Sequence, residues 1–158
     1  MLHETLITQY LDEQQVEYHL LVQSKPTTTI EDTAQERGID PAQMVKCILL
    51  RDMGGQLALA CVPGDRSVDP KKVRSALKCR RMTCVSLNEV ESITGFKIGT
   101  VAPLKLKSPL PILFDPSLLQ QKIVTISSGH NMIGVAINCE ALIKLCSPAI
   151  VPLCRVQD

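Results

Sequence analysis

The residues best suited to hold a ligand form a short loop of glycine and proline, Gly99-Thr-Val-Ala-Pro103. The wider stretch from Thr94 to Pro111 has too much Gly and Pro for a helix and too many apolar residues for a disordered linker. Gly99 lets a backbone N–H approach a ligand where a Cβ would intrude, and Pro103 fixes φ. Such a loop binds through main-chain groups, although the same pattern also fits a plain surface turn between a helix and a strand.

Basic residues are concentrated in the middle of the chain. Residues 1–40 contain eight acids and two bases, a net charge of −6, whereas residues 41–107 contain twelve bases and five acids, a net charge of +7. The densest basic run contains no acid, which suits contacts with phosphate groups. A solvated helix face followed by an edge strand guarded by charge fits equally well. The run consists of Lys71, Lys72, Arg74, Lys78, Arg80 and Arg81.

Lys46 lies between Val45 and Cys47 at the start of an apolar segment. A lysine in such a place either extends outward to solvent along the edge of a sheet or projects into a pocket as a fixed cation. The spacing alone leaves both interpretations open.

The sequence offers little support for a hydrolase that uses its own nucleophile. It has no Gly-x-Ser-x-Gly elbow, and His3, His19 and His130 have no evident acid partner. Cys79 and Cys84 are not followed by a second pair of zinc ligands, and no Gly-x-x-x-x-Gly-Lys-Ser phosphate loop occurs. These observations leave an anion-binding site without an obvious catalyst.

Hydrophobic periodicity and capping signals predict the elements that must position these residues. Thr28-x-x-Glu31 and Ser86-x-x-Glu89 resemble capping boxes, and Asp-Pro pairs at 40–41, 69–70 and 115–116 mark the starts of helices or helical turns. Residues 127–131 are expected as a loop between two strands. The expected helices cover 2–16, 28–38, 70–77, 86–94 and 140–145, and the expected strands cover 18–22, 45–51, 56–62, 80–85, 111–114, 123–126 and 135–137.

These elements alternate without a strict βαβ rhythm, and the strands at 45–51 and 56–62 form a hairpin. The pattern predicts an α+β domain with a mixed sheet. With 158 residues, 45% of them apolar, residues 1–158 are expected to form a single domain. Seven cysteines without a disulfide-like spacing indicate a reducing cytosol, and no apolar run approaches the roughly 18 residues that span a membrane. A cytoplasmic location is therefore predicted.

Short motifs along most of the chain follow the order found in one known family. They are Val45-Lys46, Val62-Pro-Gly-Asp-Arg66, Val68-Asp-Pro-Lys-Lys72, Thr94-Gly95, Gly99-x-x-x-Pro103, Ser108-Pro-Leu-Pro111 and Ser127-Ser-Gly-His130. In these motifs the chain resembles the YbaK family, which is related to the editing domain of bacterial prolyl-tRNA synthetases. The resemblance implies a mixed, partly barrel-like central β-sheet surrounded by helices. It also implies a free-standing aminoacyl-tRNA deacylase, which hydrolyses the ester of a mischarged tRNA.

The resemblance further implies roles for individual residues. Lys46 matches a functional lysine that would hold the phosphate or polar groups of the terminal adenosine, and Gly99 matches a glycine whose main chain would bind the ester carbonyl or its oxyanion. Family mechanisms let the terminal ribose hydroxyl of the tRNA assist a water or attack directly, so no protein nucleophile is implied. The implied substrate-binding residues are Gly64, Asp65, Arg66, Thr94, Pro103, Ser128, Gly129 and His130.

The resulting hypothesis is an editing hydrolase with no metal and no cofactor. It is expected to recognise the acceptor end of tRNA for proline, with the basic run at 71–81 on the tRNA backbone. Prolyl-tRNA synthetase is a further expected partner. Cysteine and alanine are the expected amino acids, and the sequence does not decide between them. His130 either lines the pocket or is a surface histidine. Two other functions remain open: a catalytically silent module that binds tRNA or a synthetase, and a nucleotide-binding protein.

Overall fold

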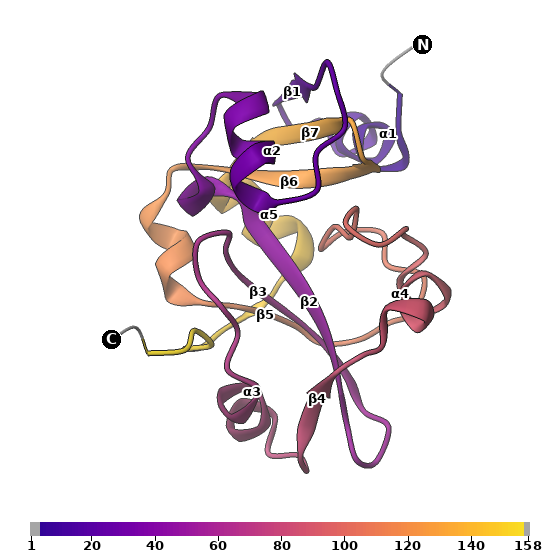
Figure 1. The fold of residues 1–158 in the computed structure, drawn as a ribbon, viewed down its shortest axis with the longest axis vertical. Coiled ribbons are helices and arrows are strands. Elements are labelled where there is room, and N and C mark those ends of the chain that lie inside the picture. The colour runs from indigo at the N-terminus through magenta and orange to yellow at the C-terminus, as the bar shows by residue number, and fades with distance from the viewer. Residues whose placement is uncertain (1–3, 157–158) are drawn as a thin grey trace.

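A computed structural model describes residues 4–156 (Figure 1). Two 3-10 turns, η1 (Pro41–Gln43) and η2 (Pro116–Gln120), accompany the helices and strands. The helices are α1 (Leu6–Glu13), α2 (Ile30–Arg37), α3 (Pro70–Leu77), α4 (Leu87–Thr94) and α5 (Cys139–Cys146). The strands are β1 (Tyr18–Val22), β2 (Val45–Asp52), β3 (Leu57–Pro63), β4 (Met82–Cys84), β5 (Ile112–Phe114), β6 (Ile123–His130), β7 (Ile133–Asn138) and β8 (Ala149–Ile150).

The described strands form two sheets. One is antiparallel with the order β1-β7-β6, and the other has the order β4-β2-β3-β5-β8. In the second sheet β3 pairs in parallel with β5, and β5 pairs in parallel with β8, whereas β2 is antiparallel to both β3 and β4. A bridge between Met44 and Thr125 connects the two sheets just before β2 begins. The predicted α+β fold with a mixed sheet is confirmed, and the sheets do not close into one barrel.

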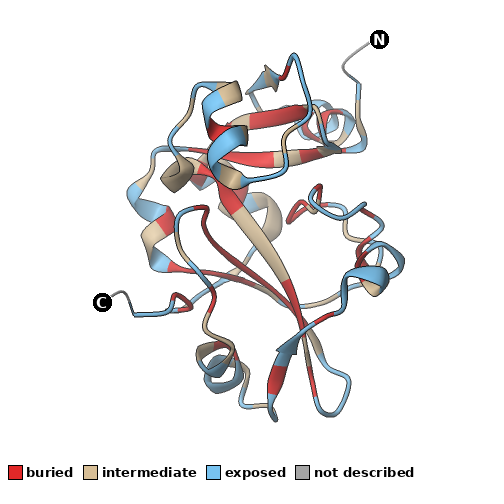
Figure 2. Ribbon diagram, viewed as in Figure 1, coloured by how far each residue is buried: buried red, intermediate tan, exposed pale blue. Residues whose placement is uncertain are grey.

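The hydrophobic core explains why β3 lies in the middle of its sheet. Six consecutive residues of β3, from Ala58 to Pro63, are buried, because the strand has neighbours on both edges and covering elements on both faces (Figure 2). One cluster, with Leu49 and Leu59, extends toward the three-stranded sheet. A second cluster packs Leu50 and Val62 against Val73 of α3. Strand β3 is therefore the central strand of its sheet and is buried on both faces.

Several predicted boundaries were wrong, mainly where side-chain caps compete. The first helix covers 6–13 rather than 2–16, because Thr5 caps it, and residues 2 and 3 lie outside the described residues. Helix α2 is capped by Thr29, whose hydroxyl accepts from the N–H of Asp32 at 3.0 Å, instead of by Thr28. Residues 127–130 continue β6 rather than forming a loop, and the two-residue strand β8 was not predicted.

Candidate functional site

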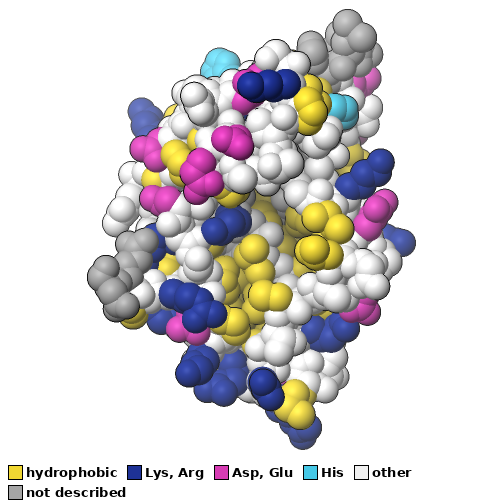
Figure 3. All heavy atoms as spheres, viewed as in Figure 1, with side chains coloured by type: hydrophobic (Ala, Val, Ile, Leu, Met, Phe, Trp, Pro, Cys, Tyr) yellow, Lys and Arg dark blue, Asp and Glu magenta, His cyan; other side chains and the backbone are white. Residues whose placement is uncertain are grey.

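A cleft of about 560 Å³ lies where α2, β2, β6, α4 and the loop at 97–101 meet. Its wall is mixed, with Thr27, Thr33, Thr125 and Ser127 among many apolar side chains. Figure 3 shows hydrophobic side chains exposed in a hollow in the middle of this face, with acids toward α2 and a group of Lys and Arg side chains toward α3. The remaining lining residues are Ile30, Arg37, Met44, Val45, Lys46, Cys47, Ile48, Leu49, Cys84, Val85, Leu87, Val90, Ile98, Gly99, Val101, Ile126, His130 and Asn131.

Lys46 extends from β2 into this cleft rather than outward along a sheet edge. Its Nζ donates to the carbonyl oxygen of Gly64 at 3.4 Å, and the side chain is half-buried. Burial lowers the pKa of Lys46, and the negative charges of Asp65 and Glu31 partly oppose that shift. A half-buried ammonium with a carbonyl as its hydrogen-bond partner keeps donors available for a ligand oxygen.

The turn at 64–66 lies beside Lys46, as its motif implied, but its three residues have different surroundings. Gly64 is buried against η1, where an added Cβ would lie 2.7 Å from the carbonyl oxygen of Pro41, so a larger residue would force the turn outward. Asp65 is exposed close enough to influence the Lys46 charge. Arg66 donates from Nη2 to the carbonyl oxygen of Arg155 at 3.2 Å and does not line the cleft.

Gly99 also lines the cleft, where it lies in a tight turn. Its φ is +82°, a left-handed conformation that strains other residues, and the N–H of Thr100 closes the turn on the carbonyl oxygen of Lys97 at 2.9 Å. A Cβ at Gly99 would meet nothing within 4 Å, so glycine is required here by conformation rather than by crowding. Within residues 4–156, the N–H of Gly99 has no protein acceptor. It is therefore free to donate to a ligand.

The Ser127–His130 segment is held by a β-bulge at the end of β6. Ser127 donates to the carbonyl oxygen of Thr100 at 2.7 Å and accepts from the N–H of Gly129 at 3.0 Å, so it ties the bulge to the Gly99 turn. Ser128 is fully buried and donates to the carbonyl oxygen of Ile133, away from the cleft. Gly129, with φ +92°, packs its backbone against Phe96. Sequence reasoning missed Ser127 as the connecting residue.

His130 lines the cleft with an exposed side chain. Its Nδ1 accepts a hydrogen bond from the backbone N–H of Met132 at 3.0 Å. This bond fixes the ring and leaves Nε2 as the free nitrogen. The structure thus places His130 at the pocket rather than on an unrelated surface.

Two residues of the loop motifs are not brought to the cleft. Thr94 is buried at the end of α4, where its hydroxyl donates to the carbonyl oxygen of Val90 at 2.8 Å and accepts from the N–H of Phe96. Pro103 is buried and borders a separate depression with Tyr10 and Leu145. Both residues shape the backbone that leads to and from the Gly99 turn, since neither reaches the space where a ligand would sit.

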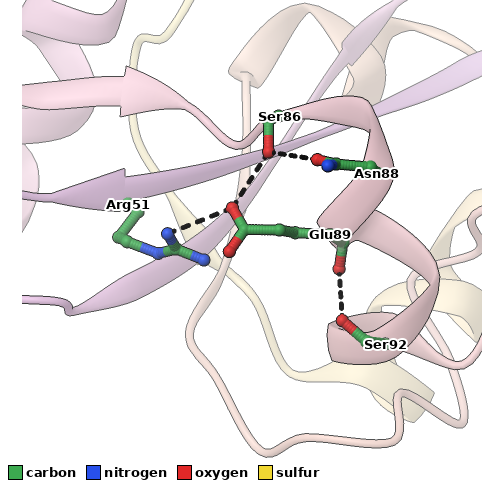
Figure 4. Close-up of polar contacts among 5 residues, drawn as sticks. All are labelled: Arg51, Ser86, Asn88, Glu89 and Ser92. Atoms are coloured by element: carbon green, nitrogen blue, oxygen red, sulfur yellow. Dashed lines mark hydrogen bonds and ion pairs between the residues drawn. The ribbon is translucent and has the colours of Figure 1, made fainter.

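Helix α4, which supplies Leu87 and Val90 to the cleft, is joined to β2 by polar contacts (Figure 4). Glu89 accepts from Arg51 at 3.2 Å and from the hydroxyl of Ser86 at 3.0 Å. Those two contacts, the Ser86 hydrogen bond first, lower the pKa of Glu89. The predicted capping box at Ser86 is wrong, because its hydroxyl donates to side chains instead of accepting from the helix backbone.

The basic run separates on folding. A second cleft of about 320 Å³ brings Lys71, Arg74 and Arg81 together with Arg155, which sequence analysis did not include because it is 74 residues further along the chain. Lys72 turns toward the C-terminal segment and donates to the carbonyl oxygen of Cys154 at 2.7 Å. Lys78 and Arg80 are exposed but do not line this second cleft. Four cations from three places in the sequence therefore share one surface.

Residues 24–145 match the family model of the aminoacyl-tRNA editing domain. The chain belongs to this family. One relative of this editing domain, from Enterococcus faecalis, is named as a candidate Cys-tRNA(Pro)/Cys-tRNA(Cys) deacylase, EbsC; it is 22% identical over 77% of the chain and 74% of its own length. The proline--tRNA ligase of Bacillus licheniformis is 32% identical over 60% of the chain. The match covers 16% of that ligase, so the likeness concerns one part of it.

Solved structures share the fold of the editing domain. The crystal structure of a hypothetical protein superposes with a TM-score of 0.87 at 21% identity, covering 94% of the chain and 99% of the neighbour. The structure of a candidate trans-editing enzyme for prolyl tRNA synthetase superposes with a TM-score of 0.81 at 24% identity, covering 95% of each chain. Between residues 4 and 156, no helix is long and apolar enough to cross a membrane. The same part of the chain contains no cluster of three or more His, Cys, Asp or Glu residues suited to a metal.

Proposed function

We propose that this editing domain hydrolyses the ester of mischarged tRNA, acting in trans on tRNA for proline that carries cysteine or alanine. The observation that carries the proposal is the cleft itself. In a chain of the editing family, Lys46 and Gly99 line the same cleft of about 560 Å³, and the N–H of Gly99 has no acceptor among residues 4–156. That volume is in the range of sites that hold a small ligand, such as a terminal nucleoside with its amino acid.

Each side of the cleft has a separate task in this proposal. Lys46 binds oxygen atoms of the terminal adenosine, and the N–H of Gly99 donates to the ester carbonyl as negative charge develops on it. One preorganised donor of this kind contributes about 3 kcal/mol to the transition state. Editing is needed because a synthetase pocket rejects a slightly smaller amino acid by only about 1 to 3 kcal/mol.

A hydroxyl of the terminal ribose assists the reaction in place of a protein nucleophile. Water adds to the ester carbonyl, the bond from the carbonyl carbon to the ribose oxygen breaks, and the ribose recovers its hydroxyl as the free amino acid leaves. Ser127 is unsuited to attack because its hydroxyl donates to the carbonyl oxygen of Thr100. Replacing the free hydroxyl of the terminal ribose by hydrogen is expected to stop release from an otherwise good substrate. Unchanged release would rule out this assistance.

The activity is tested by the release of labelled amino acid from Cys-, Ala-, Ser- and Pro-charged tRNA for proline. We expect release of cysteine or alanine well above buffer and little release of proline. Binding of all four without release of any would support a catalytically silent module. Binding of a free nucleotide with a shallow salt dependence would support the third function, since tRNA held through several phosphates gives a steep one.

A further inference from the structure

The last turn of α2 presents an arginine to the cleft that no motif indicated. Arg37 lines the cleft, and its Nε donates to Oε1 of Gln23 at 2.7 Å. Gln23 is only 4% exposed, and its amide nitrogen donates to the carbonyl oxygen of Lys25 and to the hydroxyl of Thr27. The guanidinium is therefore held from behind by a side chain that is itself fixed in orientation.

Gly134 of β7 leaves room for this guanidinium to lie against the strand. A Cβ added at Gly134 would overlap Nη1 of Arg37 and would lie 2.8 Å from its Cζ. Gly134 is not among the residues with positive φ, so its backbone conformation would accept alanine. The space, rather than the conformation, is what this glycine provides. The arrangement holds the planar group against a strand and orients its two terminal nitrogens.

The charge of Arg37 has no counterion in the described chain. No carboxylate among residues 4–156 forms an ion pair with Arg37, and its terminal nitrogens donate to no protein acceptor there. Burial lowers the pKa of Arg37 without an opposing carboxylate. A guanidinium that is kept half-buried and unpaired is typical of a site for an anion, and its fork of donors matches phosphate.

We propose that Arg37 binds a backbone phosphate next to the terminal adenosine of tRNA. The inference rests on the proposed function, and it adds a residue on the α2 side of the cleft to Lys46 on β2. A phosphate fits better than the amino group of the aminoacyl ester, because a cation repels an ammonium. It also explains why α2, an acidic helix with Glu31, Asp32 and Glu36, presents its one basic side chain to the cleft.

The experiment measures binding of an uncharged RNA minihelix that carries the acceptor stem and CCA end of tRNA for proline, from about 50 to 300 mM salt. Arg37→Met is expected to weaken binding about tenfold, the effect of one charged hydrogen-bonding contact. It is also expected to reduce the slope of log affinity against log salt by about 0.7 to 0.9, the value of one phosphate contact. Lys144→Met removes an exposed charge on α5 as the control and is expected to change neither quantity.

Gly134→Ala separates binding from a structural role. It leaves the arginine in the chain, but the added Cβ fills the space that the guanidinium occupies. We expect it to reproduce the weaker binding and the smaller salt slope of Arg37→Met. Lower thermal stability in both variants with unchanged affinity and slope would make Arg37 a structural residue and overturn the proposal. If Arg37→Met binds AMP more weakly than wild type but binds the minihelix equally well, the proposal is also overturned, and Arg37 would instead bind a free nucleotide.

The binding assay needs no turnover, so a missing phosphate contact and a missing hydrolase activity would give different results. If the wild-type protein releases no amino acid but Arg37→Met still reduces the salt slope, the hydrolase is contradicted and the phosphate contact is retained. Normal deacylation with wild-type affinity and slope in Arg37→Met would retain the hydrolase and exclude the contact.

Discussion

Lys46 and Gly99 line the same cleft but contribute different groups to it. The lysine brings a charged side chain from a regular strand, whereas the glycine brings only an N–H from a left-handed turn. Ser127 connects the second group to the β-bulge through the carbonyl oxygen of Thr100. The site therefore depends on backbone geometry as much as on side-chain chemistry, and substitutions that alter one φ angle should reveal it.

Gly99→Ala tests the role of that turn. Alanine at φ +82° costs about 1 to 2 kcal/mol of stability, and relief of the strain would move the N–H away from the ester. We expect deacylation to fall about 100-fold or more, the usual loss when one oxyanion donor is removed. The matched control is Gly55→Ala in the turn between β2 and β3, where φ is +90° and a Cβ also meets nothing within 4 Å.

Both glycine variants are expected to lose similar stability in urea unfolding, because the backbone strain is the same. Only Gly99→Ala should lose activity. Equal activity in the two variants would show that the Gly99 turn has no part in the reaction.

At the scale of single residues, motif order located Lys46, Gly99 and His130, which the structure brings to one cleft. Arg37 lies in none of the motifs, and no role was predicted for Ser127 although it begins one of them. The position of the Arg37 guanidinium depends on the space beside Gly134, almost a hundred residues away. The position of Ser127 depends on a bulge that shifts the register of β6. Ser128 lies beside Ser127 in the same motif but points into the core. Successive side chains of a strand point to opposite faces, which separates Ser127 from Ser128. Because residues 127–131 were expected as a loop, this rule could not be applied to them.

At the scale of elements, helix starts were easier to predict than the atoms that cap them. Polar residues before an apolar run located the beginnings of α2 and α4 to within two residues. The capping bonds themselves depend on which hydroxyl faces the first turn. Thr29 accepts from the helix backbone, whereas Ser86 donates to Asn88 and Glu89. Sequence spacing is the same for a cap that forms and one that does not.

Thr29→Ala and Ser86→Ala should therefore differ in cost. Loss of the Thr29 cap is expected to reduce the free energy of unfolding by about 1 kcal/mol, since an N–H at the start of α2 loses its acceptor. Ser86→Ala removes only exposed side-chain contacts and is expected to cost a few tenths of a kcal/mol. Urea unfolding of the two variants measures this difference. A larger loss for Ser86→Ala would contradict the described hydrogen bonds.

At the scale of the whole molecule, Asp115 fastens the C-terminal segment to the five-stranded sheet. One carboxylate oxygen accepts from the N–H groups of Leu153 and Cys154, and the other accepts from Ser117. Burial alone would raise the pKa of Asp115, but the hydrogen bonds from Ser117, Leu153 and Cys154 outweigh it and lower the pKa to about 2. The same segment includes β8, which is too short and too exposed to be predicted from its sequence.

Asp115→Asn is expected to reduce stability in a pH-dependent way. The pKa of the carboxyl is lower in the folded state than its ordinary value near 3.8, so the ionised group stabilises the fold above about pH 4 and ceases to do so as the pH falls toward 2. At pH 7 the loss should be about 2 kcal/mol, because each tenfold change in proton affinity corresponds to about 1.4 kcal/mol. Urea unfolding at pH 7, 4, 3 and 2 should show the difference from wild type shrinking.

Asp69→Asn is the matched control for this carboxylate. Asp69 also precedes a proline, but its side chain accepts from the N–H of Lys71 at the start of α3 and not from the C-terminal segment. It is expected to cost no more than about 1 kcal/mol. A loss for Asp115→Asn that stayed constant from pH 7 to pH 2 would refute the part assigned to its charge.

If Lys46 acts in the cleft of a deacylase, its removal must stop the single-turnover release of cysteine from Cys-charged tRNA for proline. Wild type, Lys46→Ala and the surface control Lys144→Ala are compared at equal concentration, with alanine-charged tRNA in parallel. We predict rapid release by wild type and Lys144→Ala and release no faster than buffer by Lys46→Ala, with all three proteins folded. Release by Lys46→Ala at the wild-type rate, or no release by wild type from either substrate, would contradict a deacylase that depends on Lys46.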